Sequence, residues 1–94
     1  MNNKITVSCT KKNLKQIRDF VTDYLAGYKL TDILMNQIVL AVDEICANLI
    51  IHANQEDPSK NISLSITEKA GMLKFEIVDN GVAFRRSEYK EPNI

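Results

Sequence analysis

The sequence is poor in the residues that mark several common classes of protein. It has no tryptophan, and its two cysteines, Cys9 and Cys46, form no CxxC pair. Both cysteines fall in apolar patterns, so we expect buried thiols rather than a disulfide or a metal site. The formal net charge is +0, so the overall field gives no reason to favour nucleic acid or an anionic membrane as a partner.

Long apolar runs and targeting signals are also lacking. The longest apolar stretch is interrupted by Asp43 and Glu44, which argues against a membrane span. The N-terminus, MNNKITVSC, does not have the shape of a secretory signal. We therefore expect a cytoplasmic protein. With 94 residues, of which 45% are hydrophobic and 26% charged, the chain is expected to form one small domain over residues 1–94.

The most informative stretch runs from Ile33 to Ala53. Its apolar residues recur at intervals of three and four, which predicts a long helix: Leu34, Ile38, Ala41, Val42, Ile45 and Leu49. Thr31 is the expected N-cap. A polar row of Gln37, Glu44 and Asn48 runs beside the apolar stripe. A carboxylate and a carboxamide one turn apart at the margin of a core are suited to a binding site, although they are also typical of a polar helix edge.

The rest of the chain predicts three strands and a second helix. Alternation indicates strands over Lys4 to Cys9, Asn61 to Thr67 and Leu73 to Ile77, the last two forming an antiparallel hairpin. Leu14 to Leu25 has helical spacing. The expected order is strand, helix, helix, strand, strand and a polar tail. We expect an α+β fold, a two-layer sandwich with both helices on one face of a mixed or antiparallel sheet.

The last strand leads into Asp79-Asn80-Gly81. Asn-Gly is typical of a hairpin turn, but the residues from Arg85 to Pro92 do not alternate, and proline disfavours a paired strand. We therefore expect Asp79 to end a strand and open a loop. A carboxylate there would accept a hydrogen bond from an exocyclic amine, and Gly81 would let a flat ring approach the backbone.

Taken together, two motifs resemble a known superfamily. They are Glu44-x-x-x-Asn48-x-x-x-His52-Ala53 on the long helix and Asp79-Asn80-Gly81-x-x-Phe84 after a strand. The pair resembles the histidine kinase-like, or Bergerat-fold, ATPases of DNA gyrase, histidine kinases and mismatch-repair proteins. Within that superfamily the chain is most similar to the anti-sigma-factor serine kinases, which share the opening order of strand, helix, helix and hairpin.

The resemblance implies ATP and Mg²⁺ as cofactors and a role for each site residue. Asn48 would bind Mg²⁺, which bridges the ATP phosphates. Glu44 would be the general base that polarises a serine hydroxyl or a water. Asp79 would bind the adenine amino group, with Gly81 giving the base room. The reaction would be γ-phosphoryl transfer to a serine of an anti-anti-sigma protein, and the other partner would be a sigma factor.

The sequence departs from the family after the second motif. It ends at Ile94, before the family's mobile lid, its GxGL-type motif, the helix that meets the phosphates and a further strand. We therefore expect only the N-terminal part of a partial Bergerat fold, as a fragment or a short relative. Adenine recognition would survive, whereas tight ATP binding and turnover would not. An unpaired sheet edge would favour a homodimer.

Two alternatives remain open alongside the kinase-like reading, and enzymatic activity is left undecided. The first is a non-catalytic protein-binding module built on the same fold. The second is the ATP-binding half of a histidine kinase, against which the strand at the very start argues. His52 and Phe84 are expected to be structural residues, and Arg85 and Arg86 solvated loop charges rather than phosphate ligands.

Overall fold

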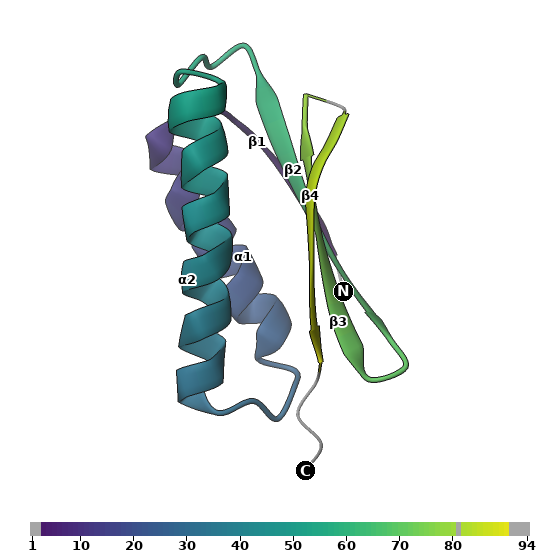
Figure 1. Cartoon of the computed structure of the whole chain (residues 1–94). Coiled ribbons are helices and arrows are strands. Elements are labelled where there is room, and N and C mark those ends of the chain that lie inside the picture. Colours follow the sequence, from purple (N-terminus) through teal and green to yellow (C-terminus); the bar gives the residue numbers. More distant parts are fainter. Residues whose placement is uncertain (1–2, 81, 91–94) are drawn as a thin grey trace.

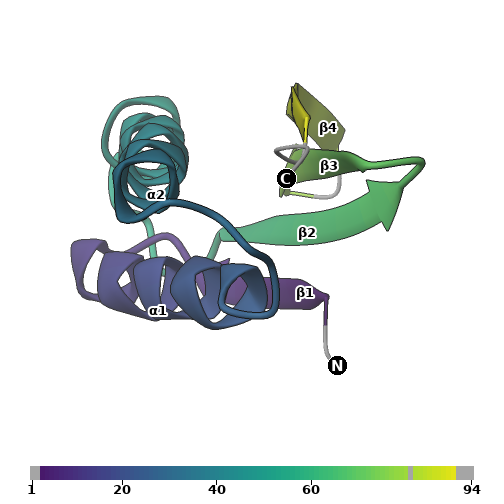
Figure 2. The same cartoon turned by 90° about the horizontal axis from the view of Figure 1, so that it is seen from below.

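The computed structural model has two layers, with two helices packed on one face of a sheet (Figures 1 and 2). It describes residues 3–80 in full and the backbone of residues 82–90. The elements are β1 (Lys4–Ser8), α1 (Leu14–Leu25), α2 (Asp32–Asn48), β2 (Asn61–Lys69), β3 (Met72–Asp79) and β4 (Val82–Lys90). A short 3₁₀ turn (Lys11–Asn13) precedes α1, and a π-helical turn, η2 (Leu49–Ala53), follows α2. The predicted α+β class and the order β-α-α-β-β are confirmed, and β4 follows them.

The sheet is antiparallel throughout, in the order β1-β2-β3-β4. Its register pairs Val7 with Ile62 and Leu64 with Ile77. Side chains alternate between the two faces of a strand, so every second residue of β2 and β3 is buried: Ile62, Leu64, Ile66, Leu73, Phe75 and Ile77. The residues between them are partly exposed. The alternation seen in the sequence therefore marks the face that the helices cover.

The expectation of a loop after Asp79 was wrong. The segment Val82–Lys90 forms β4, which pairs with β3 along the whole length of β3. Asn80 has a φ of 52°, the left-handed conformation of an Asn-Gly hairpin turn. The register shifts at Ile77/Val78, and such a bulge changes which face the following residues point to. The residues from Arg85 to Lys90 pair one for one with β3, so a mostly polar segment without alternation forms this edge strand. Asp79 does end β3, as predicted, but at a tight turn.

The helix α2 supplies much of the core. Thr31 caps it as predicted, because Leu34 N donates to Thr31 Oγ1 at 3.1 Å. Ile38, Val42 and Cys46 are buried along its inner side. Residues of η2 and α1 complete the core on this side of the sheet: Leu49, Ile50, Ile17, Val21 and Leu25. The predicted apolar stripe is thus the face that packs on the sheet and on α1.

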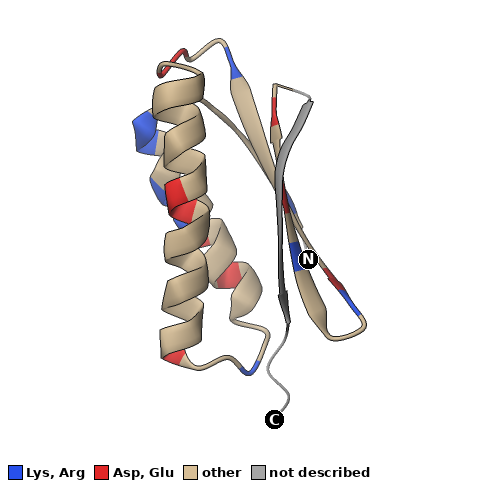
Figure 3. Ribbon diagram, in the orientation of Figure 1, with Lys and Arg blue, Asp and Glu red and all other residues tan. Residues whose placement is uncertain are grey.

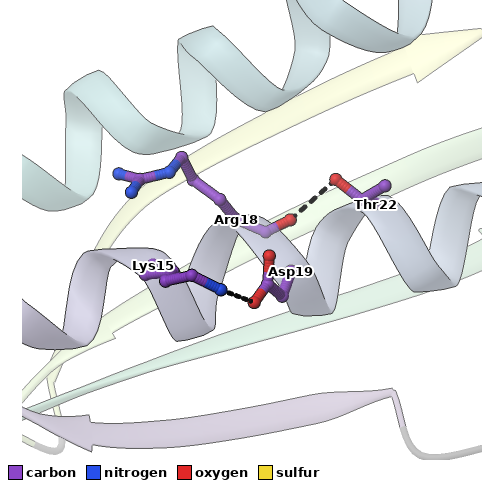
Figure 4. Close-up of polar contacts among 4 residues, drawn as sticks. All are labelled: Lys15, Arg18, Asp19 and Thr22. Atoms are coloured by element: carbon purple, nitrogen blue, oxygen red, sulfur yellow. Dashed lines mark hydrogen bonds and ion pairs between the residues drawn. The ribbon is translucent and has the colours of Figure 1, made fainter.

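The two helices are also linked by charges. Arg18 Nη1 donates to Asp43 Oδ1 at 2.9 Å across the α1–α2 contact. On α1 itself, Lys15 pairs with Asp19 at 2.9 Å, and the Thr22 hydroxyl donates to the carbonyl of Arg18 (Figure 4). Basic residues lie in the 3₁₀ turn and the first part of α1, and acidic residues lie in the later part of α1 and in the middle of α2 (Figure 3).

The continuous helical segment Asp32–Ala53 has 22 residues and is long and apolar enough, by length and composition alone, to cross a membrane. Asp43 and Glu44 therefore do not by themselves exclude a membrane span. Core helices meet the same criterion, and this helix buries its apolar side against the sheet and α1.

Candidate functional site

An open pocket of about 730 Å³ runs along one side of the long helix. Its wall carries the polar side chains of Glu44, Asn48 and His52, which follow one another at intervals of four residues and are all exposed. The apolar part of its lining is Ala41, Ile45, Leu49 and Ala53. The structure thus brings the two predicted helix residues together in one hollow. It adds His52, which we had expected to be a structural residue only.

The helix changes pitch within the stretch that lines this pocket. The turn η2 is π-helical, and Asn54 N donates to Leu49 O at 2.9 Å, five residues back. Single π-turns inside or at the end of α-helices occur frequently at functional sites. Two residues with positive φ follow, Gln55 (52°) and Glu56 (55°), and turn the chain towards β2. The wide turn brings Asn54 into the space between the helix end and the end of β3.

Asp79 lies in that same space. Its Oδ1 accepts hydrogen bonds from Asn54 Nδ2 and from Asn80 Nδ2, both at 3.0 Å. Asn54 Oδ1 in turn accepts from Asn80 Nδ2 at 2.8 Å. Asn80 is anchored to the start of β2, because its N donates to Asn61 O and its Oδ1 accepts from Asn61 N. The three side chains form a closed network between the ends of the helix and of two strands.

This network connects Asp79 to the pocket that Glu44 and Asn48 line. Asn54 Nδ2 also donates to Leu49 O at 2.8 Å, and Leu49 lines the pocket next to Asn48. In the described part of the chain the pocket wall comes wholly from α2 and η2. Asp79 therefore stands beside the pocket, linked to it through Asn54 and Leu49. Gly81 lies outside the described residues, as do the side chains of Phe84, Arg85 and Arg86.

Sequence analysis missed Asn54. It is 3% exposed and is the buried polar residue of the described chain. One signal could have found it: a side chain able to bond nearby backbone groups stands directly after the helix-ending motif, where such residues satisfy free carbonyls. That local signal does not predict which residue of the sheet Asn54 contacts. Its hydrogen bond to Asp79 is seen only in the structure.

Two carboxylates lie near the buried thiol of Cys9 at this end of the molecule. Cys9, at the end of β1, is buried, and burial together with the nearby carboxylates of Asp79 and Asp57 raises the pKa of its thiol. Hydrogen bonds from the Ser59 hydroxyl and backbone N hold the pKa of Asp57 below its usual value. Burial raises the pKa of Cys46 to about 12, with Asp43 adding to the effect. Both cysteines are free and buried, which confirms the prediction of buried thiols.

The donor set suits a magnesium nucleotide better than a bare metal ion. Residues 3–80 contain no group of three His, Cys, Asp or Glu side chains placed to hold a metal. Mg²⁺ in proteins commonly takes one or two side-chain oxygens and completes its shell with substrate phosphates and waters. The exposed carboxamide of Asn48, with the Glu44 carboxylate one turn away, could supply such side-chain oxygens.

The fold is that of a partial histidine kinase-like ATPase domain, with two helices over one face of an antiparallel sheet. A model of the family described as "Histidine kinase-like ATPase domain" matches residues 7–94. The chain therefore belongs to the histidine kinase-like ATPase domain family, whose members bind ATP, typically with Mg²⁺. No curated protein sequence matches it.

Proposed function

We propose that this chain is an ATP-binding regulatory domain of the anti-sigma serine kinase type, acting in the cytoplasm. The observation that carries the proposal is the arrangement of Glu44 and Asn48 in one open pocket, next to a strand-end carboxylate, Asp79, that is tied to the same helix end. A carboxylate, a carboxamide and an acceptor for a purine amine are the groups that the family chemistry requires.

Each residue has a distinct task in this proposal. The Asp79 carboxylate accepts a hydrogen bond from the 6-amino group of adenine. Asn48 would hold Mg²⁺ through its carboxamide oxygen, and the ion would neutralise phosphate charge. The exposed Glu44 carboxylate would act as general base towards a serine hydroxyl, which requires hydrogen-bond reach in the complex. Gly81 would leave room for the purine ring.

The partners follow from the same proposal. The protein that presents the serine would be an anti-anti-sigma protein, and a sigma factor would be the regulated partner, with no direct contact to nucleic acid. The open edges of the described sheet are β1 and β4, rather than β3. An exposed edge strand can pair with another chain, so a homodimer through either edge is part of the proposal.

The test is a titration of the chain with ATP in the presence of Mg²⁺, followed by chemical shifts of backbone amides. We expect saturable changes centred on Asn48, Asn54 and Asp79, which Asp79→Ala abolishes. Asp23→Ala is the matched control, because Asp23 is an exposed acid on α1, and it should bind as the wild type does. The proposal fails if the wild-type chain shows no saturable change.

Activity towards a protein is tested separately, with candidate partners captured from an extract and incubated with γ-labelled ATP. Transfer of label to a serine, lost in Glu44→Gln, supports the kinase role. A partner that is retained without any transfer, and equally well by Glu44→Ala and Asn48→Ala, would instead identify the chain as a non-catalytic binding module.

A further inference from the structure

The burial of Asn54 is the starting observation. A buried polar side chain is costly unless its hydrogen bonds are made, and every polar group of this side chain is used. Nδ2 donates to Leu49 O at 2.8 Å and to Asp79 Oδ1 at 3.0 Å, while Oδ1 accepts from Asn80 Nδ2 at 2.8 Å. Its backbone N and O are bonded as well, to Leu49 O and Asp57 N.

The orientation of the Asn54 amide is fixed by these partners. If the amide were turned over, Oδ1 would face two acceptors, Leu49 O and Asp79 Oδ1, and Nδ2 would face the Nδ2 donor of Asn80. Both contacts would be repulsive. The amide of Asn80 is fixed in the same way, because its Oδ1 accepts from Asn61 N at 3.0 Å. The network therefore has one arrangement of donors and acceptors.

This arrangement treats the two oxygens of Asp79 differently. Within the part of the chain that the structure describes, both hydrogen bonds to this carboxylate go to Oδ1, and Oδ2 receives none. A carboxylate held by two donors at one oxygen cannot turn freely about its last torsion. Oδ2 is then presented as an acceptor in a fixed direction.

We propose that Asn54 is a positioning residue for nucleotide selection: it holds Asp79 Oδ1 and so aims Oδ2 at the exocyclic amine of a 6-aminopurine. The inference rests on the proposed nucleotide-binding function. At position 6 adenine carries an amine, a donor, whereas hypoxanthine and guanine carry a carbonyl, an acceptor. A fixed acceptor at that point favours the amine of adenine and repels the carbonyl of hypoxanthine or guanine. Unpaired or opposed polar groups of this kind discriminate strongly between ligands.

The same residue ties the base-binding end of the site to the phosphate-binding end. Asn54 Nδ2 bonds both Asp79 and the carbonyl of Leu49, and Leu49 follows Asn48 directly in the chain. One side chain therefore links the acceptor for the purine to the helix that carries the carboxamide for the metal-bound phosphates. Positioning of this kind matters because small displacements of binding groups are costly.

The test compares the dissociation constants of ATP and inosine triphosphate, each with Mg²⁺, on the full chain. We expect the wild type to prefer ATP and Asn54→Ala to lower that preference by about three- to tenfold, as expected for losing a charge-assisted hydrogen bond that fixes the acceptor. Asn54→Asp keeps the shape but places an acceptor against Asp79 Oδ1, and it should lower the preference at least as much. Asn61→Ala removes only an exposed side chain at the other side of the network and should leave the ratio unchanged.

The outcomes separate the inference from the function on which it rests. If Asn54→Ala weakens ATP and inosine triphosphate equally, or leaves both unchanged, Asn54 is merely structural and the inference is overturned. If the wild type binds neither nucleotide, the proposed function fails and takes the inference with it. A measurement on the free protein covers the case of variants that do not fold. The side-chain amide resonance of Asn54 should be protected from exchange in the wild type and should shift in Asp79→Asn, and an exposed, unshifted amide overturns the inference.

Discussion

Arg18 and Asp43 join the two helices through a hydrogen-bonded ion pair of 2.9 Å. Asp43 is followed directly in the sequence by Glu44, and the two acids have different surroundings. The first of these acids faces α1 and is neutralised by Arg18, whereas the second lines the open pocket. Within the described residues no basic side chain forms an ion pair with Glu44. Two adjacent carboxylates thus have different surroundings, one paired at the contact between the helices and one open to the pocket.

The ion pair should contribute only modestly to stability. The two side chains are 44% and 24% exposed, so solvent screens their attraction, and pairs of this kind contribute about 0.2–1 kcal/mol. A double-mutant cycle with Arg18→Ala and Asp43→Ala, followed by urea unfolding, should return a coupling energy in that range that shrinks in high salt. The exposed pair Lys15 and Asp19 on α1 is the control and should give less. A coupling above about 2 kcal/mol would contradict this description.

Removing the carboxamide that is proposed to hold Mg²⁺ should separate binding of the phosphates from binding of the base. We expect Asn48→Ala to abolish the dependence of ATP affinity on Mg²⁺ while leaving adenosine binding unchanged, because Asp79 and its network are untouched. Titrations with ATP and with adenosine, each with and without Mg²⁺, measure this. Asn36→Ala is the control, because it alters an exposed asparagine of α2 that does not line the pocket. It should change neither the Mg²⁺ dependence of ATP affinity nor the affinity for adenosine. Equal loss of ATP and adenosine binding in Asn48→Ala would refute the assigned role.

Neutralising the candidate base should not weaken ATP binding. Glu44 lines the pocket next to Asn48, so in the proposed complex its charge repels the phosphates. Glu44→Gln is therefore expected to bind ATP about as tightly as the wild type or up to a few-fold more tightly, with the gain greatest at low salt. The affinity at two ionic strengths is the readout, and Asp23→Asn controls for net charge. A marked loss of affinity would show that Glu44 binds the nucleotide rather than acting as a base.

Alkaline pH should destabilise the chain through Cys46. Burial holds this thiol neutral in the folded state, with its pKa raised from 9.0 to about 12. In the unfolded chain the thiol loses its proton above pH 9, so the unfolded state binds fewer protons and stability falls as the pH rises from 9 to 12. The slope from this group is at most about 1.4 kcal/mol per pH unit. Urea unfolding at several pH values should show a shallower slope in Cys46→Ala, and equal slopes would contradict the argument.

The division of α2 into a buried and an exposed side is tested by one substitution at two positions. Ile38 is 1% exposed, whereas Ile33 on the same helix is 73% exposed. Ile38→Val should cost about 0.5–1.5 kcal/mol of unfolding free energy, because it removes a packed methylene from the core. Ile33→Val should lie within about 0.5 kcal/mol of the wild type. Similar losses at both positions would mean that the exposed side of α2 is covered in solution.

The sequence was most informative where a local rule and the tertiary structure agree. The Thr31 cap, the apolar stripe of α2 and the alternation in β2 and β3 follow from periodicity and from single side-chain bonds, and all were predictable. The strand β4 was not, because its residues from Arg85 to Lys90 are mostly polar and do not alternate, although they pair one for one with β3. Asn54 was missed for another reason: its partner Asp79 lies 25 residues away, and no local pattern records that contact.

The π-turn Leu49–Ala53 also restricts how the chain can vary in length. A π-turn accommodates one residue more than an α-helical turn, and the hydrogen bond from Asn54 N to Leu49 O depends on that extra residue. Deleting one residue here would close the turn to ordinary helical pitch and remove the hydrogen bond from Asn54 N to Leu49 O. The carboxamide of Asn54 would then lose the backbone position from which it reaches Asp79. We therefore expect this turn not to tolerate the insertions and deletions that a surface loop tolerates.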